Sequence, residues 1–209
     1  LSSFLVVWLS ILSKEERRLK FFVNGKFVEK DEAKVSVLDR GFLYGDGIYE
    51  VIKIYKNKKP FLLDWHMERL ANSAKGIDLP LEKVGGISEI EAVIQKLIEL
   101  GPPEGALYLE ITRGASEKRT HGCPRDLKPT VVAWIQELTH IPEEFHKNGV
   151  KVITHPDWRT AIAEVKHVNR LMNEWIFQKA QDAGAFEAIL VRDGMITEAT
   201  SDNVFFVMH

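Results

Sequence analysis

The chain has 209 residues, of which 45% are hydrophobic and 28% charged, a composition typical of folded globular proteins. Its 28 Lys and Arg nearly balance its 30 Asp and Glu, so the formal net charge of -2 gives no whole-chain attraction to nucleic acid or to an anionic membrane. A single cysteine, Cys123, excludes an internal disulfide and a cysteine-rich metal centre, and favours a reducing, cytoplasmic location.

Residues 1–19 begin with the apolar run Leu1–Leu12, followed by charged residues. The run is shorter than the roughly 17–25 residues of a bilayer-spanning helix, and its positive charges come after it, unlike those of a signal peptide. We therefore treat residues 1–19 as an N-terminal extension of uncertain status and expect no membrane association. The chain starts without Met and stops in the apolar, strand-like run Val204–Val207, so we expect a fragment that lacks its C-terminal end.

Residues 20–136 carry the pattern of a small α+β domain. Apolar runs on both sides of Asn24-Gly25 predict a tight β-hairpin, because this dipeptide accepts the positive φ angles that such turns need. The other elements expected here, in chain order, are strands at Ile48–Tyr55 and Phe61–Leu63, a helix capped by Asp64 that runs to about Lys75, and strands at Ala106–Thr112 and Thr130–Gln136.

A second helix is expected between these last strands and the first helix. Ser88 and Glu91 have the spacing of a capping box, in which each residue satisfies a free backbone N–H of the first turn. Gly101-Pro102-Pro103 would end the helix. Its apolar stripe would consist of Ile90, Ile94, Leu97 and Ile98.

We expect a linker at residues 137–147 and the first part of a larger, cofactor-binding domain at residues 148–209. The expected elements there are a strand at Val150–Thr154, a helix from about Asn169 to Ala183, and a hairpin of Phe186–Val191 and Met195–Thr197 around Asp193-Gly194. The helix should turn Leu171, Met172, Trp175, Ile176 and Ala180 inward.

The segment Asp39–Glu50 (DRGFLYGDGIYE) contains three glycines but matches neither the dinucleotide-binding nor the P-loop pattern. One interpretation is a tight loop that enters a strand. The other is a loop that brings the hydroxyl of Tyr49 and the carboxylate of Glu50 to a cleft.

Arg119-Thr120-His121 lies in a polar loop, Thr112–Pro124, between two expected buried strands. Its charges could simply be solvated. Alternatively, because side chains at i and i+2 of an extended segment point to the same side, Arg119 and His121 could together bind a carboxylate.

Lys166 and Glu198 are the remaining candidates for chemistry. A lysine is usually a surface residue, but Lys166 follows the apolar stretch Ala161–Ala163 and precedes the expected helix, where a desolvated amine can form a Schiff base. Glu198 is either a solvated edge residue or a carboxylate for a protonated ring nitrogen, with the hydroxyls of Thr200 and Ser201 in the same pocket. We find no metal-binding or serine-hydrolase motif.

Four segments in this order resemble the fold-type IV pyridoxal-phosphate enzymes, which include branched-chain and D-amino-acid aminotransferases and aminodeoxychorismate lyase. The segments are DRGFLYGDGIYE, His66–Leu70, Lys166–Asn169 and Glu198–Val204. The resemblance extends from about Phe21 to Val207 and implies a two-domain α+β/α/β fold whose second domain is incomplete here.

The resemblance also implies roles for individual residues. Lys166 would hold pyridoxal 5'-phosphate as a Schiff base and move the substrate proton, Arg69 would contact the cofactor phosphate, and Glu198 would bind the pyridine nitrogen. Tyr49, Arg119 and His121 would hold the substrate carboxylate, as in the D-amino-acid branch. The family builds its site between two subunits, so the resemblance also implies a homodimer.

The leading hypothesis is a transferase that exchanges an amino group between D-alanine and 2-oxoglutarate. Three alternatives remain open: a branched-chain L-amino-acid aminotransferase, an aminodeoxychorismate lyase on the same fold, and a non-catalytic fragment that binds no cofactor.

Overall fold

The computed structural model describes residues 20–159 and 162–208, and it divides into two compact units. The first unit contains the described part of residues 1–138 together with Glu164–Val168, and the second contains Thr139–Ala163 and Asn169–His209. The expected extension at residues 1–19 lies outside the described residues. The short segment Glu164–Val168 therefore belongs to the first unit, although it is separated from the rest of that unit by residues 139–163.

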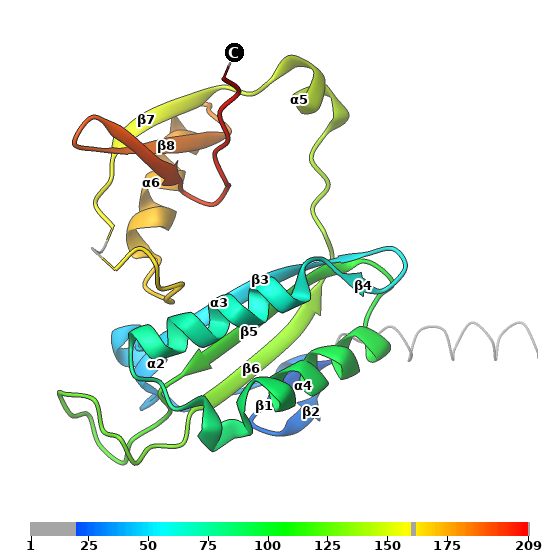
Figure 1. Cartoon of the computed structure of the whole chain (residues 1–209), viewed down its shortest axis with the longest axis vertical. Helices are drawn as coiled ribbons and strands as arrows, with labels where there is room; N and C mark the ends of the chain where they lie inside the picture. Colours follow the sequence, from blue (N-terminus) through cyan, green and yellow to red (C-terminus); the bar gives the residue numbers. More distant parts are fainter. Residues whose placement is uncertain (1–19, 160–161, 209) are drawn as a thin grey trace, which may run out of the picture. The chain divides into compact units, whose positions relative to one another are not determined.

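The first unit is built on a six-stranded antiparallel sheet with the strand order β2-β1-β6-β5-β3-β4 (Figure 1). Its strands are β1 (Phe21–Val23), β2 (Lys26–Val28), β3 (Gly47–Tyr55), β4 (Lys59–Pro60), β5 (Gly105–Thr112) and β6 (Thr130–Gln136). The hairpin at Asn24-Gly25 is confirmed: both residues have positive φ angles, of 49° and 91°. The expected strands at the positions of β3, β5 and β6 are confirmed too.

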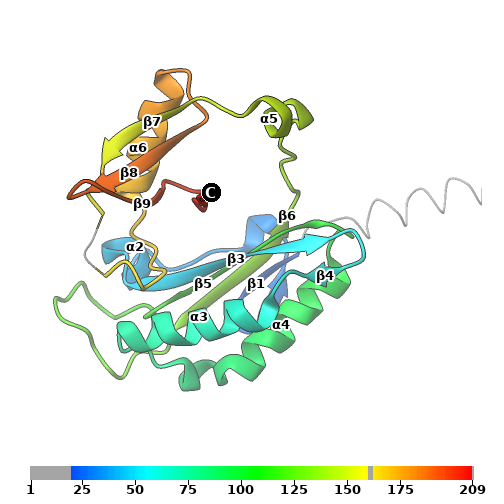
Figure 2. The ribbon, with the colours of Figure 1, turned by 45° about the horizontal axis from the view of Figure 1, so that its top comes forward.

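Two helices, α3 (Leu63–Gly76) and α4 (Gly86–Leu100), cover one face of this sheet (Figures 1 and 2). Shorter helical turns are η1 (Lys30–Glu32), α2 (Arg40–Tyr44) and η2 (Leu81–Val84). The core lies between the helices and alternate residues of the strands, and the expected stripe of α4 is buried in it. Removing these apolar side chains from water stabilises the unit by about 25 cal/mol for each Å² of apolar surface buried.

The sheet face away from α3 and α4 carries a row of aromatic rings. Successive strand residues point to opposite faces, so Tyr49, Tyr108, Trp134 and Phe21 line up across β3, β5, β6 and β1. Their ring centroids lie 5.8 Å apart for Tyr49–Tyr108, 4.5 Å for Tyr108–Trp134 and 5.6 Å for Phe21–Trp134.

Both helix starts differ from the sequence prediction. Phe61–Leu63 is not a strand: the returning strand is the two-residue β4, and Leu62, with a left-handed φ of 49°, turns the chain directly into α3. Asp64 lies in the first turn and does not cap it. The capping box at Ser88 is also wrong, because α4 already begins at Gly86, after Gly85 turns the chain with a φ of 89°.

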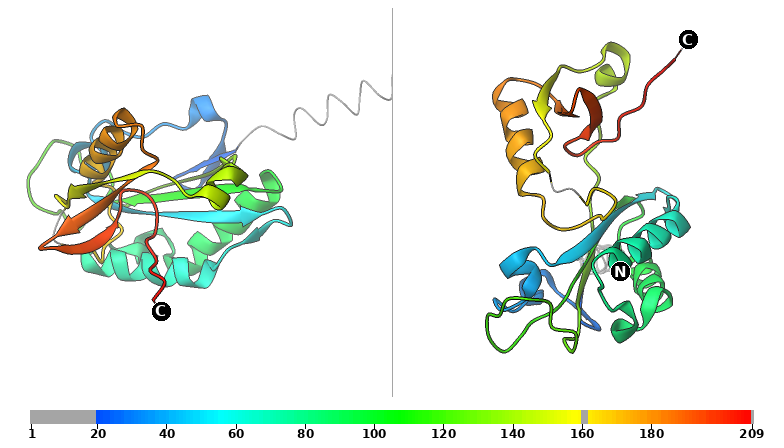
Figure 3. Two further views of the ribbon diagram at one scale, coloured as in Figure 1. Left: turned by 90° about the horizontal axis from the view of Figure 1, so that it is seen from above. Right: turned by 60° about the vertical axis from the view of Figure 1, so that its left-hand side comes forward.

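The second unit contains a three-stranded sheet of order β7-β8-β9 and the helices α5 (Glu143–Asn148) and α6 (Leu171–Asp182) (Figure 3). Strand β7 (Val152–Pro156) is parallel to β8 (Glu187–Arg192), which pairs with β9 (Met195–Ala199) in the expected antiparallel hairpin. The core of this unit is small, and it consists of Ile176, Ala180, Ala185, Ala188 and Leu190, with Ile153 packed against it.

α5 lies largely within the linker expected at residues 137–147. Two expectations for the second unit are corrected. Leu171 and Trp175 are exposed, because the buried face of α6 is formed instead by Asn173, Ile176 and Ala180, at the spacing i, i+3 and i+7. The run Val204–Val207 forms no strand, and most of its side chains are exposed.

Candidate active site

Lys166 is carried by a segment that pairs with the beginning of β3. The backbone N–H of Tyr49 donates to the carbonyl of Lys166 at 3.0 Å, and the N–H of Val168 donates to the carbonyl of Gly47 at 3.1 Å. The N–H of Lys166 itself donates to Oγ of Ser73 on α3, also at 3.0 Å. Next to it, Val165 is buried in the core of the first unit. The backbone of Lys166 is therefore held on both sides.

The amine of Lys166 lies over the ring of Tyr49, with Nζ 4.6 Å from the ring centroid. This contact brings together two of the predicted site residues, which are far apart in the sequence. The packing of the Lys166 segment on α3 depends on Gly76, because a Cβ there would lie 2.6 Å from Cγ2 of Val165.

Glu50 points to the opposite face of the sheet from Tyr49, so the two do not enter one cleft as the sequence suggested. Its carboxylate is fully buried and pairs with Arg69 of α3, with Nε–Oε1 at 2.7 Å and Nη2–Oε2 at 2.6 Å. Nδ1 of His66 is 2.7 Å from Oε2. Burial alone would raise the pKa of Glu50, but the hydrogen bonds and charges of Arg69 and His66 bring it below its usual value.

Arg69 therefore has a partner within the protein. The same hydrogen bonds raise the pKa of its guanidinium, and about half of the side-chain surface, 47%, stays exposed. A half-exposed guanidinium, on α3 one turn before the Ser73 that binds the Lys166 backbone, is a suitable phosphate ligand, and its orientation is fixed by Glu50.

Arg119 and His121 are exposed and lie in the loop between β5 and β6, where both contact the ring of Tyr44 in α2. The base of this loop is held by a buried ion cluster that the sequence reasoning missed. Asp46 accepts from Nε of Arg40 at 2.7 Å and from Nε of Arg113 at 2.9 Å. Charged residues next to buried strands were the available signal, but the cluster joins positions far apart in the chain.

In the second unit, Thr200 and Ser201 surround a buried carboxylate, that of Glu187. Oε2 of Glu187 accepts from the N–H of Ser201 at 3.0 Å and from its hydroxyl at 2.8 Å. Oε1 accepts from the N–H of Ala188 at 2.6 Å and from the hydroxyl of Thr200. Burial would raise the pKa of Glu187, and these donors lower it overall. Glu187 was not singled out from the sequence, where it is one acid at the start of an apolar strand.

Glu198 pairs with Nη1 of Arg159, and 46% of its side chain is exposed. The same guanidinium binds the buried Asp157, with Nε–Oδ1 at 2.9 Å and Nη2–Oδ2 at 2.8 Å. The hydroxyl of Thr197 donates to Asp157 at 2.9 Å. Burial acts to raise the pKa of Asp157, but these hydrogen bonds hold it far below its usual value. Glu198 is thus a half-exposed carboxylate in a defined position.

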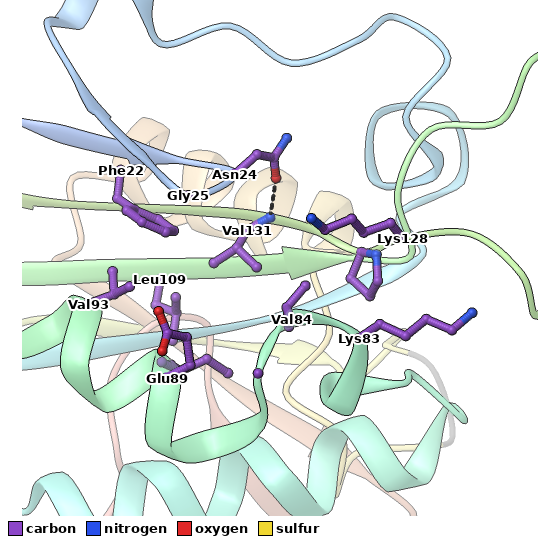
Figure 4. Close-up of a pocket in the computed structure, with 13 residues that line it drawn as sticks. Phe22, Asn24, Gly25, Lys83, Val84, Glu89, Val93, Leu109, Lys128 and Val131 are labelled. Atoms are coloured by element: carbon purple, nitrogen blue, oxygen red, sulfur yellow. Dashed lines mark hydrogen bonds between the residues drawn. The ribbon is translucent and has the colours of Figure 1, made fainter.

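A cavity of about 270 Å³ opens in the first unit between the β1–β2 hairpin and the start of α4 (Figure 4). Its walls are mainly apolar, and they include Phe22, Leu109 and Val131 from the sheet and Val93 from α4. None of the predicted site residues lines it. Tyr49, over which the Lys166 amine lies, points to the other face of the sheet.

Among residues 20–159 and 162–208, no cluster of three or more His, Cys, Asp or Glu side chains is arranged to bind a metal ion. In the same part of the chain, every helix is too short or too polar to cross a bilayer.

Comparison with known proteins gives concordant findings. The family model described as amino-transferase class IV matches residues 47–209. A D-alanine aminotransferase from Bacillus licheniformis is 42% identical over 190 residues, which cover 90% of this chain and 65% of that protein. The chain thus spans slightly less than two thirds of that relative.

Solved structures share the fold. The branched-chain amino acid aminotransferase of Escherichia coli superposes with a TM-score of 0.75 at 22% identity, over 87% of this chain and 62% of that one. The 4-amino-4-deoxychorismate lyase of Pseudomonas aeruginosa gives a TM-score of 0.71 at 24% identity, over 87% and 64%. The expected fold-type IV architecture, of which this chain covers the N-terminal part, is confirmed.

Proposed function

Because the chain belongs to the class IV aminotransferase family, we propose that the protein is a pyridoxal-phosphate-dependent transferase that exchanges an amino group between D-alanine and 2-oxoglutarate. The 42% identity to a D-alanine aminotransferase supports these substrates over those of the branched-chain enzyme and the lyase, which share the fold at lower identity. The observation that carries the proposal is the Lys166 amine, held beside β3 over the ring of Tyr49.

The donor chemistry of the predicted residues fits pyridoxal phosphate. Lys166 offers a primary amine for the aldehyde group, and Arg69 a half-exposed guanidinium for the phosphate. Glu198 offers a half-exposed carboxylate for the ring nitrogen. Thr200 and Ser201 donate their hydroxyls to Glu187, and these hydrogen bonds hold the turn in place. We propose that this turn binds the cofactor. Bound in this way, the cofactor supplies an electron sink that weakens the Cα–H bond of the substrate.

Lys166 has a second proposed role, as the base that moves the substrate proton. Its backbone is fixed by Ser73 and Tyr49, so only the flexible side chain would have to move for the amine to act as a base. The amine would take the proton from Cα of the substrate and deliver it to C4′ of the cofactor.

We assign Arg119 and His121 to the substrate carboxylate. A guanidinium and an imidazole can both donate hydrogen bonds to it, and both are exposed on the loop where a small anion can approach. Tyr49 is the third proposed contact. Fixing the carboxylate limits the orientations in which Cα can present its hydrogen to Lys166.

The proposal is tested by the absorbance spectrum of the complete protein with pyridoxal phosphate, with Lys166→Ala as the test variant. Lys179→Ala is the matched control, because Lys179 also lies over an aromatic ring, that of Trp175 at 4.1 Å, but on the outside of α6. Wild type and the Lys179 variant should show the absorbance of lysine-bound cofactor, and the Lys166 variant should not.

Substrates then separate the candidate reactions. Bleaching of this absorbance by D-alanine, but not by L-alanine or L-leucine, would support the D-amino-acid reaction. Bleaching by L-leucine would instead indicate the branched-chain reaction, and pyruvate release from aminodeoxychorismate without an amino acceptor would indicate the lyase. A complete protein that binds no cofactor would overturn the proposal in favour of a non-catalytic role.

We also propose that the protein is a cytoplasmic homodimer whose site uses the Arg119 loop of one subunit and Lys166 of the other. Mixing two inactive variants, Lys166→Ala and Arg119→Ala, under conditions of subunit exchange tests the shared site. Mixed dimers would contain one intact site, so activity should return to about a quarter of the wild-type value. A mixture that stays inactive would contradict a shared site.

A further inference from the structure

Tyr44, the last residue of α2, is joined to the loop between β5 and β6 by a hydrogen bond at the middle of the Arg119-Thr120-His121 segment. Its hydroxyl donates to the carbonyl of Thr120 at 3.0 Å. Nη1 of Arg40, one turn earlier in α2, donates to the same carbonyl at 3.1 Å. Two donors from one short helix thus fix a single peptide group of an otherwise exposed loop.

The ring of Tyr44 also contacts the side chains on both sides of this peptide group. The guanidinium carbon of Arg119 lies 5.5 Å from the ring centroid, and the ring of His121 lies 6.4 Å from it. One tyrosine therefore contacts both residues that we assign to the substrate carboxylate.

The helix that carries Tyr44 is itself rigidly attached. Asp39 caps its first turn by accepting from the N–H of Gly41 at 2.8 Å, and Gly45, with a φ of 65°, ends it. The buried Arg40 is paired with Asp46, which also binds Arg113. The guanidinium of Arg113 donates to the carbonyls of Ile77 and Asp78 beyond α3, at 2.7 and 2.9 Å. The contact therefore ties the loop to the core of the unit.

From these contacts we infer that Tyr44 is a positioning residue, which holds Arg119 and His121 in the orientation that binds a carboxylate. The inference rests on the proposed function for the identity of the ligand, whereas the ordering of the loop does not depend on it. An ordered loop loses less conformational entropy when the substrate binds, so Tyr44 should act on substrate affinity and not on the chemical step.

The test variant is Tyr44→Phe, which removes the hydroxyl and keeps the ring. Tyr55→Phe is the matched control, because Tyr55 is a half-exposed tyrosine at the far end of β3, packed on Phe61. In the complete enzyme, Tyr44→Phe should raise KM for both substrates about threefold to tenfold, the range expected for one lost hydrogen bond, with kcat changed less than twofold. The control should leave both unchanged.

Limited proteolysis with trypsin provides a readout that does not require activity. Cleavage after Lys118 and Arg119, followed by mass spectrometry, should be faster in Tyr44→Phe than in wild type or the control. If cleavage rates are equal, Tyr44 does not order the loop and the inference is wrong. If cleavage is faster in a protein that transaminates nothing, the loop contact stands and the proposed function fails.

A double-mutant cycle then tests whether Tyr44 acts through its neighbours. In a His121→Ala background, Tyr44→Phe should have a smaller effect on KM than in wild type, because one of the two residues that it positions is gone. An undiminished effect in this background, or a fall in kcat with KM unchanged, would overturn the positioning role.

Discussion

Glu50 in the first unit and Glu187 in the second are both almost completely buried, and both have a pKa below its usual value. They reach this state by different means. Glu50 is compensated by the guanidinium of Arg69 and the imidazole of His66, both from α3. Glu187 accepts hydrogen bonds from neutral donors, namely backbone N–H groups and the hydroxyls of Thr200 and Ser201.

The difference shows that a buried carboxylate can serve as two kinds of connection. Glu50 joins a helix to the sheet through charge, and it orients the guanidinium that we assign to the cofactor phosphate. Glu187 instead holds a turn, because its donors follow one another directly after β9. Oriented dipoles can stabilise a buried anion when several of them converge on it, without a cation.

The largest effect is expected for Glu187→Gln. The amide keeps the shape of the side chain, but its NH₂ group would face donors of Ala188 and Thr200 or of Ser201. A buried N–H facing another donor loses its hydrogen bonds, so we expect a loss of about 3 kcal/mol of unfolding free energy in the second unit. Urea unfolding measures this loss, and hydrogen exchange at Thr200 and Ser201 should accelerate in parallel.

Glu143→Gln is the control for this prediction, because Glu143 is an exposed residue of α5 whose ion pair with Lys147 lies on the surface. It should change stability by less than about 0.5 kcal/mol. Equal stability of the two variants would mean that the donors around Glu187 do not require a charged acceptor.

A smaller effect is expected for Arg69→Lys, which keeps the positive charge but loses the two-point contact with Glu50. We expect a loss of about 1–2 kcal/mol in the first unit, measured by thermal unfolding without added cofactor. Because about half of the Arg69 side chain is exposed, 0.5 M NaCl should weaken the wild-type contact and narrow the gap between the two proteins. The loss of stability in Glu187→Gln should not depend on salt. A salt-dependent loss would contradict the stabilisation of Glu187 by neutral donors.

Acid should remove the stability contributed by the charged carboxylates of Glu50 and Glu187. This effect should be smaller than that of either substitution. The native pKa values of Glu50 and Glu187 are below 4.5, so the unfolded chain binds protons more readily at these positions. The stability that they contribute is fully present above pH 4.5 and is lost as the pH falls through the lower native values. Unfolding measured from pH 7 to pH 3 should show this decline, with a shallower slope in Glu187→Gln.

The smallest effect concerns a third glutamate that has neither kind of compensation. Glu110 accepts one hydrogen bond, from the hydroxyl of Tyr108 at 2.8 Å. Burial raises its pKa, the Tyr108 bond lowers it in part, and the negative charge of Asp39 raises it further. Its folded-state pKa lies above the unfolded one, so stability falls as the pH rises through it.

Glu110→Gln should therefore stabilise the protein at pH 8 by less than about 1 kcal/mol and have no effect in acid, as measured by thermal unfolding at both pH values. Destabilisation at pH 8 would show that a positive charge or a further hydrogen-bond donor stabilises the charged form of Glu110.

The sequence predicts local structure well where one short segment contains the whole signal. Asn24-Gly25 specifies its turn, and the apolar spacing of Ile90, Ile94 and Leu97 specifies the buried face of α4. Starts of helices were less predictable, because the backbone angles of Leu62 and Gly85 decide them and not the nearby capping residues Asp64 and Ser88.

The sequence names candidate site residues, but it does not give their arrangement. Tyr49 and Glu50 are neighbours in β3, so alternation places them on opposite faces, whereas the loop interpretation of residues 39–50 brought both to one cleft. The pairing of Lys166 with β3, the binding of Glu187 to Thr200, and the contact of Tyr44 with Thr120 all join residues distant in the sequence. Such partners are set by tertiary packing, and no local pattern encodes them.

The placement of Glu164–Val168 in the first unit has a consequence for how this protein can be divided. The chain leaves the first unit after Leu138, returns for five residues, and leaves again. A piece that ends at Leu138 would lack Val165 and would leave the early edge of β3, Gly47–Tyr49, without its partner. Open strand edges attract other chains, so such a piece would tend to aggregate. Gene fusion, domain exchange or truncation after Leu138 therefore cuts through the first unit, and the two units have to stay in one chain.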